Sequence, residues 1–178
     1  MTTNKDIKTD PFSDTSNQRI IIKRCNLDDL DGVIKVNEEE LPEDYPYFFY
    51  KSILDNYPES FLLAQNDQGK IVGYIMWRVE KSPSLDSLRY INNGHLVSIA
   101  VSQDYRKRGI AKSLLTHSMQ ATKKYKIHEY VLEVRVSNYN AIKLYERFKF
   151  QIVNIKKNYY RDGENAYYMT LKTKKRLD

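Results

Sequence analysis

Two stretches of the chain each consist of an apolar run, a polar loop and a helical pattern, in that order. This repeated order constrains the fold more than any other feature of the sequence. The first run is Leu96–Val101, and its helical pattern starts at Ile110. The second is Tyr130–Val136, and its pattern starts near Asn138. Two strands that are each followed by a helix can lie side by side in parallel. Ligands favour the carboxyl ends of such strands, so we expect function there.

The loop after the first run is basic and contains a glycine directly before the helix. It reads Arg106-Lys107-Arg108-Gly109 and enters the helix at Ile110-Ala111-Lys112. A helix N-terminus presents unpaired N–H groups and partial positive charge, and a glycine lets an anion approach the main chain. The segment is therefore typical of a phosphate-binding loop. Taken alone, it is equally compatible with a solvated loop.

The remaining pattern predicts a mixed α+β fold with an antiparallel majority and a parallel junction. Asn66-Asp67-Gln68-Gly69 and Asp162-Gly163 are the turn signals of two hairpins. The polar segment Lys81–Asn93 is expected to be a connection rather than a strand. The other expected elements are, in order, strand 19–23, helix 27–41, helix 47–56, strands 61–65, 71–79 and 96–101, helix 110–124, strand 130–136, helix 138–148, and strands 152–159 and 166–171.

The chain has 178 residues, which is enough for one domain without a disulfide or metal to stabilise it. We expect a disordered tail at 1–18, a single folded domain at 19–173 and a basic tail at 174–178. Cys25 is the only cysteine, which excludes an internal disulfide and fits a reducing cytoplasm. No secretory signal or membrane-spanning run is visible, so the expected location is cytoplasmic.

The formal net charge is +6, and its basic clusters include Lys123-Lys124 and Lys156-Lys157. Such a surface attracts polyanions, which could be a phosphorylated cofactor, ribosomal RNA or another nucleic acid. The competing interpretation is that these lysines only keep the protein in solution.

Several motifs together resemble the GNAT acetyltransferases. Arg106 to Ala111 fits their Gln/Arg-x-x-Gly-x-Gly/Ala acetyl-CoA loop. Within that superfamily the chain is most similar to protein N-terminal acetyltransferases of the NatA catalytic type and their archaeal relatives, over about Arg19 to Leu171. This narrower resemblance is carried by Leu41-Pro42-Glu43-Asp44-Tyr45, Gly94-His95, Ser98-Ile99-Ala100-Val101, Ser137-Asn138 with Leu144-Tyr145, and Tyr159-Tyr160-Arg161-Asp162-Gly163-Glu164.

The resemblance implies a GNAT fold, a mixed and mostly antiparallel sheet with about four helices and a parallel strand pair that splays at the cofactor. It implies acetyl-CoA as cosubstrate, bound by the Arg106 to Lys112 loop, by Asn138 and by the backbone of Ile99, Ala100 and Val101. Tyr145 would protonate the departing thiolate. Asn138 could instead cap a helix, and Tyr145 could instead be a packing residue, since the chain has 15 tyrosines.

Three residues compete as the base that removes the proton from the substrate amine: Glu43, His95 and Glu133. In related enzymes a glutamate lies in the loop that Glu43 occupies, and a residue pair at the positions of His95 and Glu133 holds a water. Glu43 could instead be a plain loop carboxylate, and Glu133 could pair with Arg135, which lies on the same strand face. A metal at His95 and Glu133 is disfavoured, because two ligands are fewer than catalytic zinc sites use.

The function expected is transfer of the acetyl group to the α-amino group of protein N-termini, with broad specificity and with Tyr45 and Tyr160 binding the substrate backbone. The ribosome is a further expected partner; DNA and membranes are not. Two alternatives stay open. One is a GNAT enzyme that acetylates lysine side chains or small amines. The other is a basic adaptor for RNA or the ribosome, although the sequence lacks a ribonucleoprotein motif.

Overall fold

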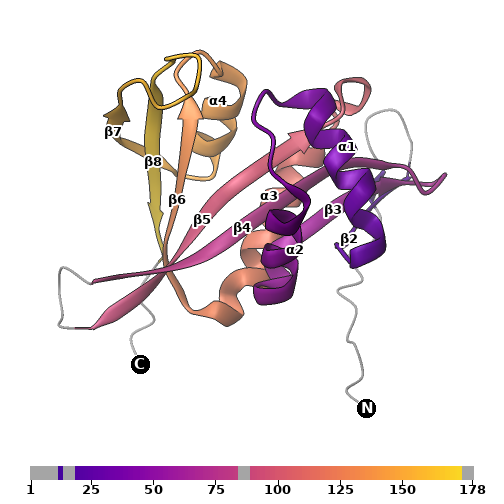
Figure 1. Cartoon of the computed structure of the whole chain (residues 1–178), viewed down its shortest axis with the longest axis horizontal. Coiled ribbons are helices and arrows are strands. Elements are labelled where there is room, and N and C mark those ends of the chain that lie inside the picture. Colours follow the sequence, from indigo (N-terminus) through magenta and orange to yellow (C-terminus); the bar gives the residue numbers. More distant parts are fainter. Residues whose placement is uncertain (1–11, 14–18, 84–88, 174–178) are drawn as a thin grey trace. The chain divides into compact units, whose positions relative to one another are not determined.

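The computed structural model describes residues 12–13, 19–83 and 89–173. The chain forms two compact units, the first made of Met1–Arg78 and Val97–Lys123 and the second of Val79–Leu96 and Lys124–Asp178. The strands are hydrogen-bonded in the order β1-β2-β3-β4-β5-β6-β8-β7, and two of them, β4 (Ile71–Pro83) and β5 (Tyr90–Val101), each contribute residues to both units (Figure 1).

The first unit combines an antiparallel ladder with three α-helices. Its strands β1 (Phe12–Ser13), β2 (Arg19–Arg24), β3 (Phe61–Asn66) and the first part of β4 pair in sequence order. Its helices are α1 (Leu30–Glu40), α2 (Tyr47–Asn56) and α3 (Ile110–Ala121). Asn26 and Asp29 form a capping box at the 3₁₀ turn that leads into α1. The hairpin turn at 66–69 forms as predicted, with Gly69 at a φ of +81°.

Alternation along β4 separates two apolar layers in this unit. Tyr74 and Met76 belong to the core that α1, α2 and β3 also fill. Trp77 points to the opposite face, where its indole N–H donates to Ser118 Oγ of α3 at 2.9 Å. Burial of such large side chains stabilises the fold by roughly 1.5–3 kcal/mol each.

The second unit carries the parallel strand pair. Here β5 pairs in parallel with β6 (Ile127–Arg135) from Asn92 and Ile127 to His95 and Val131. The ladder then continues antiparallel from β6 to β8 (Ala166–Lys172) and from β8 to β7 (Gln151–Lys156). Helix α4 (Tyr139–Arg147) follows β6 and buries Ile142 and Tyr145. A side chain at Gly94 would begin 2.8 Å from the Tyr130 ring, so glycine permits the close pairing of β5 with β6.

The predicted mixed fold and element order are confirmed, with four α-helices among the described residues and one parallel pair. The predicted connection at Lys81–Asn93 is wrong at both ends, because β4 continues to Pro83 and β5 already begins at Tyr90. Polar residues extend these strands, since a strand needs hydrogen-bonded neighbours more than apolar side chains. Strand β7 is also shorter than the expected 152–159, because it ends at Lys156.

The expected tails at 1–18 and 174–178 lie largely outside the described residues. The exception is β1, which pairs Phe12 with Ile20 and Ser13 with Arg19, in a segment expected to lack structure. The limits of a single domain at 19 and 173 therefore stay predictions. No helix in the described ranges is both long and apolar enough to cross a membrane.

Candidate active site

The basic loop in the first unit fits an anion by its backbone. Gly109 is the N-cap of α3 and has a φ of +87°, and no side chain caps this helix end. A Cβ placed on Gly109 would meet nothing within 4 Å, so the space beside the glycine is open. The following turn has the unpaired N–H groups of a helix N-terminus. These observations fit the pyrophosphate of a CoA-type cofactor.

Two arginine side chains of this loop have partners within the protein. Arg106 does not project freely, because its guanidinium forms an ion pair with Glu40 of α1 and its Nε donates to the Val101 carbonyl at 3.1 Å. Arg108 donates to the Asp104 carbonyl at 2.6 Å and stacks over the Tyr105 ring. Lys107 and Lys112 are exposed. Arg106 and Arg108 therefore shape the loop, and the lysines are left as the better candidates for phosphate contact.

A buried polar relay connects the loop containing Glu43 to β5. Asn37 of α1 donates from Nδ2 to the Glu43 carbonyl at 2.7 Å. Its Oδ1 accepts from the Tyr74 hydroxyl at 2.5 Å, and that hydroxyl also lies 2.6 Å from Ser98 Oγ. Asn37 and Tyr74 are both fully buried. The relay thus fixes the backbone at Glu43 against the strand that carries Ile99 to Val101.

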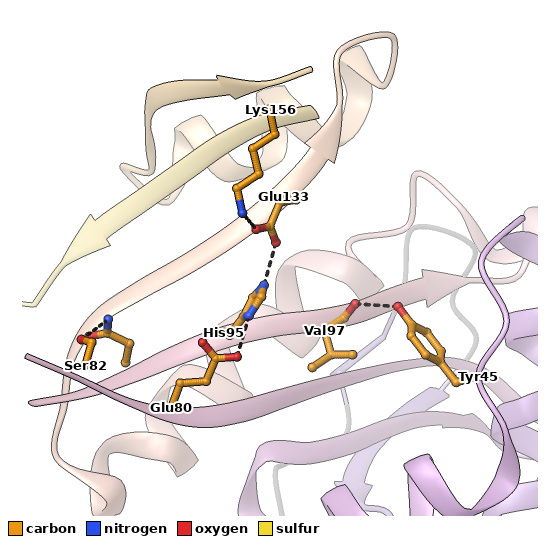
Figure 2. A network of polar contacts seen from close by, with 8 residues as sticks. Tyr45, Glu80, Ser82, His95, Val97, Glu133 and Lys156 are labelled. Atoms are coloured by element: carbon orange, nitrogen blue, oxygen red, sulfur yellow. Dashed lines mark hydrogen bonds and ion pairs between the residues drawn. The ribbon is translucent and has the colours of Figure 1, made fainter. Parts of the chain in front are cut away.

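Tyr45 belongs to the same loop and is held from two sides. Its hydroxyl donates to the Val97 carbonyl at 3.3 Å, as Figure 2 shows, and its ring stacks on Phe49 with centroids 4.9 Å apart. The relay and this contact together give Glu43 and Tyr45 a defined position in the first unit. The side chain of Glu43 is half-buried.

In the second unit, the structure brings His95 and Glu133 into direct contact. His95 Nε2 lies 2.6 Å from Glu133 Oε2, and its Nδ1 lies 3.0 Å from Glu80 Oε1 (Figure 2). The other oxygen of Glu133 pairs with the Lys156 ammonium. The alternative that Glu133 pairs with Arg135 is wrong, because Arg135 binds Asp162 and Glu164 instead. Of the two interpretations of the basic clusters, the one that treats Lys156 as only a solvated lysine is therefore excluded.

The contacts shift both titrating groups toward their charged forms. Burial alone would lower the pKa of His95, but hydrogen bonds to Glu133 and Glu80 outweigh it and raise that pKa above its ordinary value. Burial would likewise raise the pKa of Glu133, yet His95 and Lys156 lower it to about 2. Among the described residues, no cluster of three or more His, Cys, Asp or Glu side chains could hold a metal ion.

Tyr145 is buried in the second unit and packs edge-on against Phe150, with ring centroids 5.9 Å apart. Burial raises its pKa well above the ordinary value near 10, so the phenol keeps its proton throughout the working pH range. Asn138 caps α4 by accepting from the Ala141 N–H at 3.2 Å. Asn138 therefore has the helix-capping role that was its alternative in the sequence analysis.

The turn between β7 and β8 is fixed by Arg135. Its guanidinium lies 4.0 Å from the centre of the Tyr160 ring and pairs with Asp162 and Glu164, both at 2.7 Å. Glu164 also accepts from the Ser137 N–H at 3.0 Å. This clamp gives Tyr160, the expected substrate-binding residue, a defined place in the second unit.

Sequence reasoning missed Glu80, Lys156, Asn37 and Tyr74. Asn37 had a visible signal, since it lies four residues after Val33 on the apolar face of α1, where a polar residue needs a buried partner. Glu80 could have been found only by continuing the β4 strand past Val79.

The comparisons with known proteins agree with this geometry. Residues 26–150 match the acetyltransferase (GNAT) family model. The chain belongs to the GNAT acetyltransferase family. It is 47% identical over 153 residues to an N-alpha-acetyltransferase of Saccharolobus solfataricus, covering 83% of this chain and 90% of that protein. It is also 36% identical to the N-terminal acetyltransferase A complex catalytic subunit ard1 of Schizosaccharomyces pombe, covering 83% and 82%.

A solved structure adds the fold in three dimensions. The chain is similar to Chaetomium thermophilum Naa20 in complex with a bisubstrate analogue, with a TM-score of 0.73, 27% identity and 86% of each chain covered. The expected resemblance to N-terminal acetyltransferases of the NatA catalytic type and to archaeal relatives is thereby confirmed.

Proposed function

We propose that this protein transfers the acetyl group of acetyl-CoA to the α-amino group of protein N-termini. The observation that carries the proposal is the uncapped N-terminus of α3 at Gly109, with open space beside it, in a chain 47% identical to an N-alpha-acetyltransferase. Bound acetyl-CoA supplies an activated acetyl thioester. The α3 N-terminus and the exposed Lys107 and Lys112 would hold its phosphates.

The chain's own residues would supply the remaining chemistry. An α-amino group has a pKa near 8, so most of it is protonated at pH 7 and a nearby base must accept one proton. Glu43 in the first unit and the pair His95 with Glu133 in the second are the candidates for that base. A backbone N–H of Ile99 to Val101 would polarise the thioester oxygen, and Tyr145 would donate to the thiolate.

The substrate peptide would be bound mainly through its backbone by Tyr45 and Tyr160, which supports broad specificity. Both tyrosines are held in fixed positions, Tyr45 by the Val97 carbonyl and Phe49, and Tyr160 by Arg135. We place the reaction in the cytoplasm, and an association with the ribosome remains part of this proposal.

The test is an acetyl-transfer assay with a library of short peptides that differ in their first two residues. We expect incorporation of one acetyl group at the free α-amine, and none when the α-amine is blocked and a lysine side chain is left free. Acetylation of the internal lysine at an equal rate would favour a lysine acetyltransferase instead.

A further inference from the structure

His95 contacts a carboxylate through each of its two ring nitrogens. Glu80, on β4, lies 3.0 Å from Nδ1, and Glu133, on β6, lies 2.6 Å from Nε2. In Figure 2 the imidazole lies between these two carboxylates, and the Lys156 ammonium approaches Glu133 from β7. All four residues belong to the second unit.

With both carboxylates ionised, this arrangement requires a proton on each ring nitrogen. An ionised carboxylate can only accept hydrogen bonds, so a ring nitrogen that contacts one must carry a hydrogen. A neutral imidazole has one N–H and would leave its other nitrogen facing an oxygen lone pair. Glu133 cannot relieve this by protonation near neutral pH, because Lys156 and His95 both hold it in the ionised form.

We propose that Glu80 is a positioning residue that holds His95 as a doubly protonated imidazolium in the resting protein. His95 then becomes a proton acceptor only after it has released one of its ring protons. The proposal deepens the proposed function, on which its kinetic part rests. Glu80 thereby sets the pH above which the base pair of His95 with Glu133 can act.

The charges around the ring are compatible with this state. Two carboxylates, Glu80 and Glu133, face two cations, the imidazolium of His95 and the ammonium of Lys156. The Lys156 ammonium also lies 4.7 Å from the centre of the Tyr168 ring on β8. The Tyr168 phenol is neutral, because burial and the nearby carboxylates raise its pKa. The side chains of His95 and Glu133 are 19% and 6% exposed, so water screens this pair weakly, whereas Glu80 and Lys156 are more exposed and more strongly screened.

The direct test is a ¹⁵N NMR titration of the imidazole rings. The chain has three histidines, so His117 and His128 serve as internal references. We expect both ring nitrogens of His95 to carry protons at pH 7, and Glu80→Gln to lower the titration midpoint of His95 by about one pH unit. Lys156→Met should move the midpoint in the opposite direction, because Glu133 then faces no competing cation.

Glu146→Gln is the matched control, because Glu146 is an exposed carboxylate of α4 in the same unit. It should leave the His95 midpoint unchanged. A neutral His95 tautomer in the wild type at pH 7, or a midpoint that Glu80→Gln does not move, would overturn the proposal. Because this titration needs no turnover, it remains decisive even if the acetyl-transfer function fails.

The kinetic test is the pH dependence of kcat/KM for a peptide that uses His95. The acid limb should move to lower pH in Glu80→Gln by the same amount as the NMR midpoint, which a merely structural role would not produce. An NMR shift without a kinetic shift would refute the part of the proposal that makes His95 the gated base.

Discussion

Gly109 is the residue on which the proposed cofactor site depends most. Its φ of +87° is a left-handed conformation that costs an L-residue roughly 1–2 kcal/mol, yet the space around it is open. We predict that Gly109→Val leaves the protein folded and weakens acetyl-CoA binding by roughly tenfold or more, because the side chain enters the space beside the α3 N-terminus. Isothermal calorimetry measures this affinity.

The control is Gly69→Val, which introduces the same side chain at a similar φ, +81°, in the hairpin turn. Its cofactor affinity should stay at the wild-type value. Equal affinity in Gly109→Val and wild type would remove the main support for the cofactor site.

The proposed role of Tyr145 as a proton donor depends on its hydroxyl group. Phenylalanine keeps the packing against Phe150 and removes only the hydroxyl group, so stability should change little. We predict that Tyr145→Phe lowers kcat by roughly 10²-fold and changes the peptide KM less, because a proton donor acts in the transition state. Since burial raises the pKa of this phenol, the loss should persist across neutral and mildly alkaline pH.

Rapid-quench measurement of the acetyl-transfer step separates this loss from slow product release. A fully active Tyr145→Phe would identify Tyr145 as a packing residue and leave water to protonate the thiolate.

At the scale of the elements, the buried relay through Asn37 couples α1 to the loop that carries Glu43. We predict that Asn37→Ala lowers kcat/KM for the peptide by roughly tenfold, because the Glu43 carbonyl loses its 2.7 Å hydrogen bond and the loop loses its fixed position. It should also lower the free energy of unfolding by about 1–3 kcal/mol, since the Tyr74 hydroxyl loses a buried partner. Urea denaturation and steady-state kinetics measure the two effects.

Trp77→Phe is the matched control for this prediction. It also breaks a buried hydrogen bond in the first unit, to Ser118, but on the face of β4 opposite to the relay. It should destabilise the protein without a comparable loss of peptide kcat/KM. Similar kinetic losses in both variants would mean that the relay has no specific role.

The order of elements could be predicted from the sequence because short segments of the chain determine it. Apolar runs, the turn at Asn66 to Gly69 and the loop before Ile110 each have a short-range physical cause. The lengths of β4 and β5 could not be predicted, since polar residues at 81–83 and 90–93 become strand only through partners far away in the chain. Tertiary pairing outweighs local composition there.

Only part of the candidate site could be predicted from the sequence, because some of its contacts depend on how distant strands pair. The proximity of His95 and Glu133 was anticipated through the resemblance, and the Gly109 loop through its own pattern. Glu80 reaches His95, and Lys156 reaches Glu133, only when β4, β6 and β7 adopt their register, which no local signal encodes. Polar networks between strands are therefore the part of a site that sequence reasoning finds last.

At the scale of the whole molecule, the candidate bases belong to different units. Glu43 lies in the first, held by the relay, whereas His95 and Glu133 lie in the second, held by Glu80 and Lys156. The proposed doubly protonated state concerns the second set only, because His95 must lose a ring proton before it can act as a base. Two separate bases allow different substrates to depend on different residues.

We predict that Glu43→Gln lowers transfer to peptides that begin with Ser or Ala by roughly 10²-fold and spares peptides that begin with Met-Leu. The double variant His95→Ala with Glu133→Gln should show the reverse bias. The rates are to be measured side by side, at a pH above the His95 transition, so that its neutral form is present. Asp44→Asn, which removes the neighbouring exposed carboxylate, is the matched control and should leave both rates near wild type.

The ratio of the two rates decides between the arrangements, because any general loss of stability or cofactor affinity lowers both rates together and cancels. Opposite ratios in the two variants would show two bases with divided substrates. Equal losses on both peptides from either variant would contradict the division and indicate one catalytic unit that needs all three residues. Unchanged rates in both variants would leave proton removal to bulk water, in which case transfer should follow the fraction of neutral α-amine, with its pKa near 8.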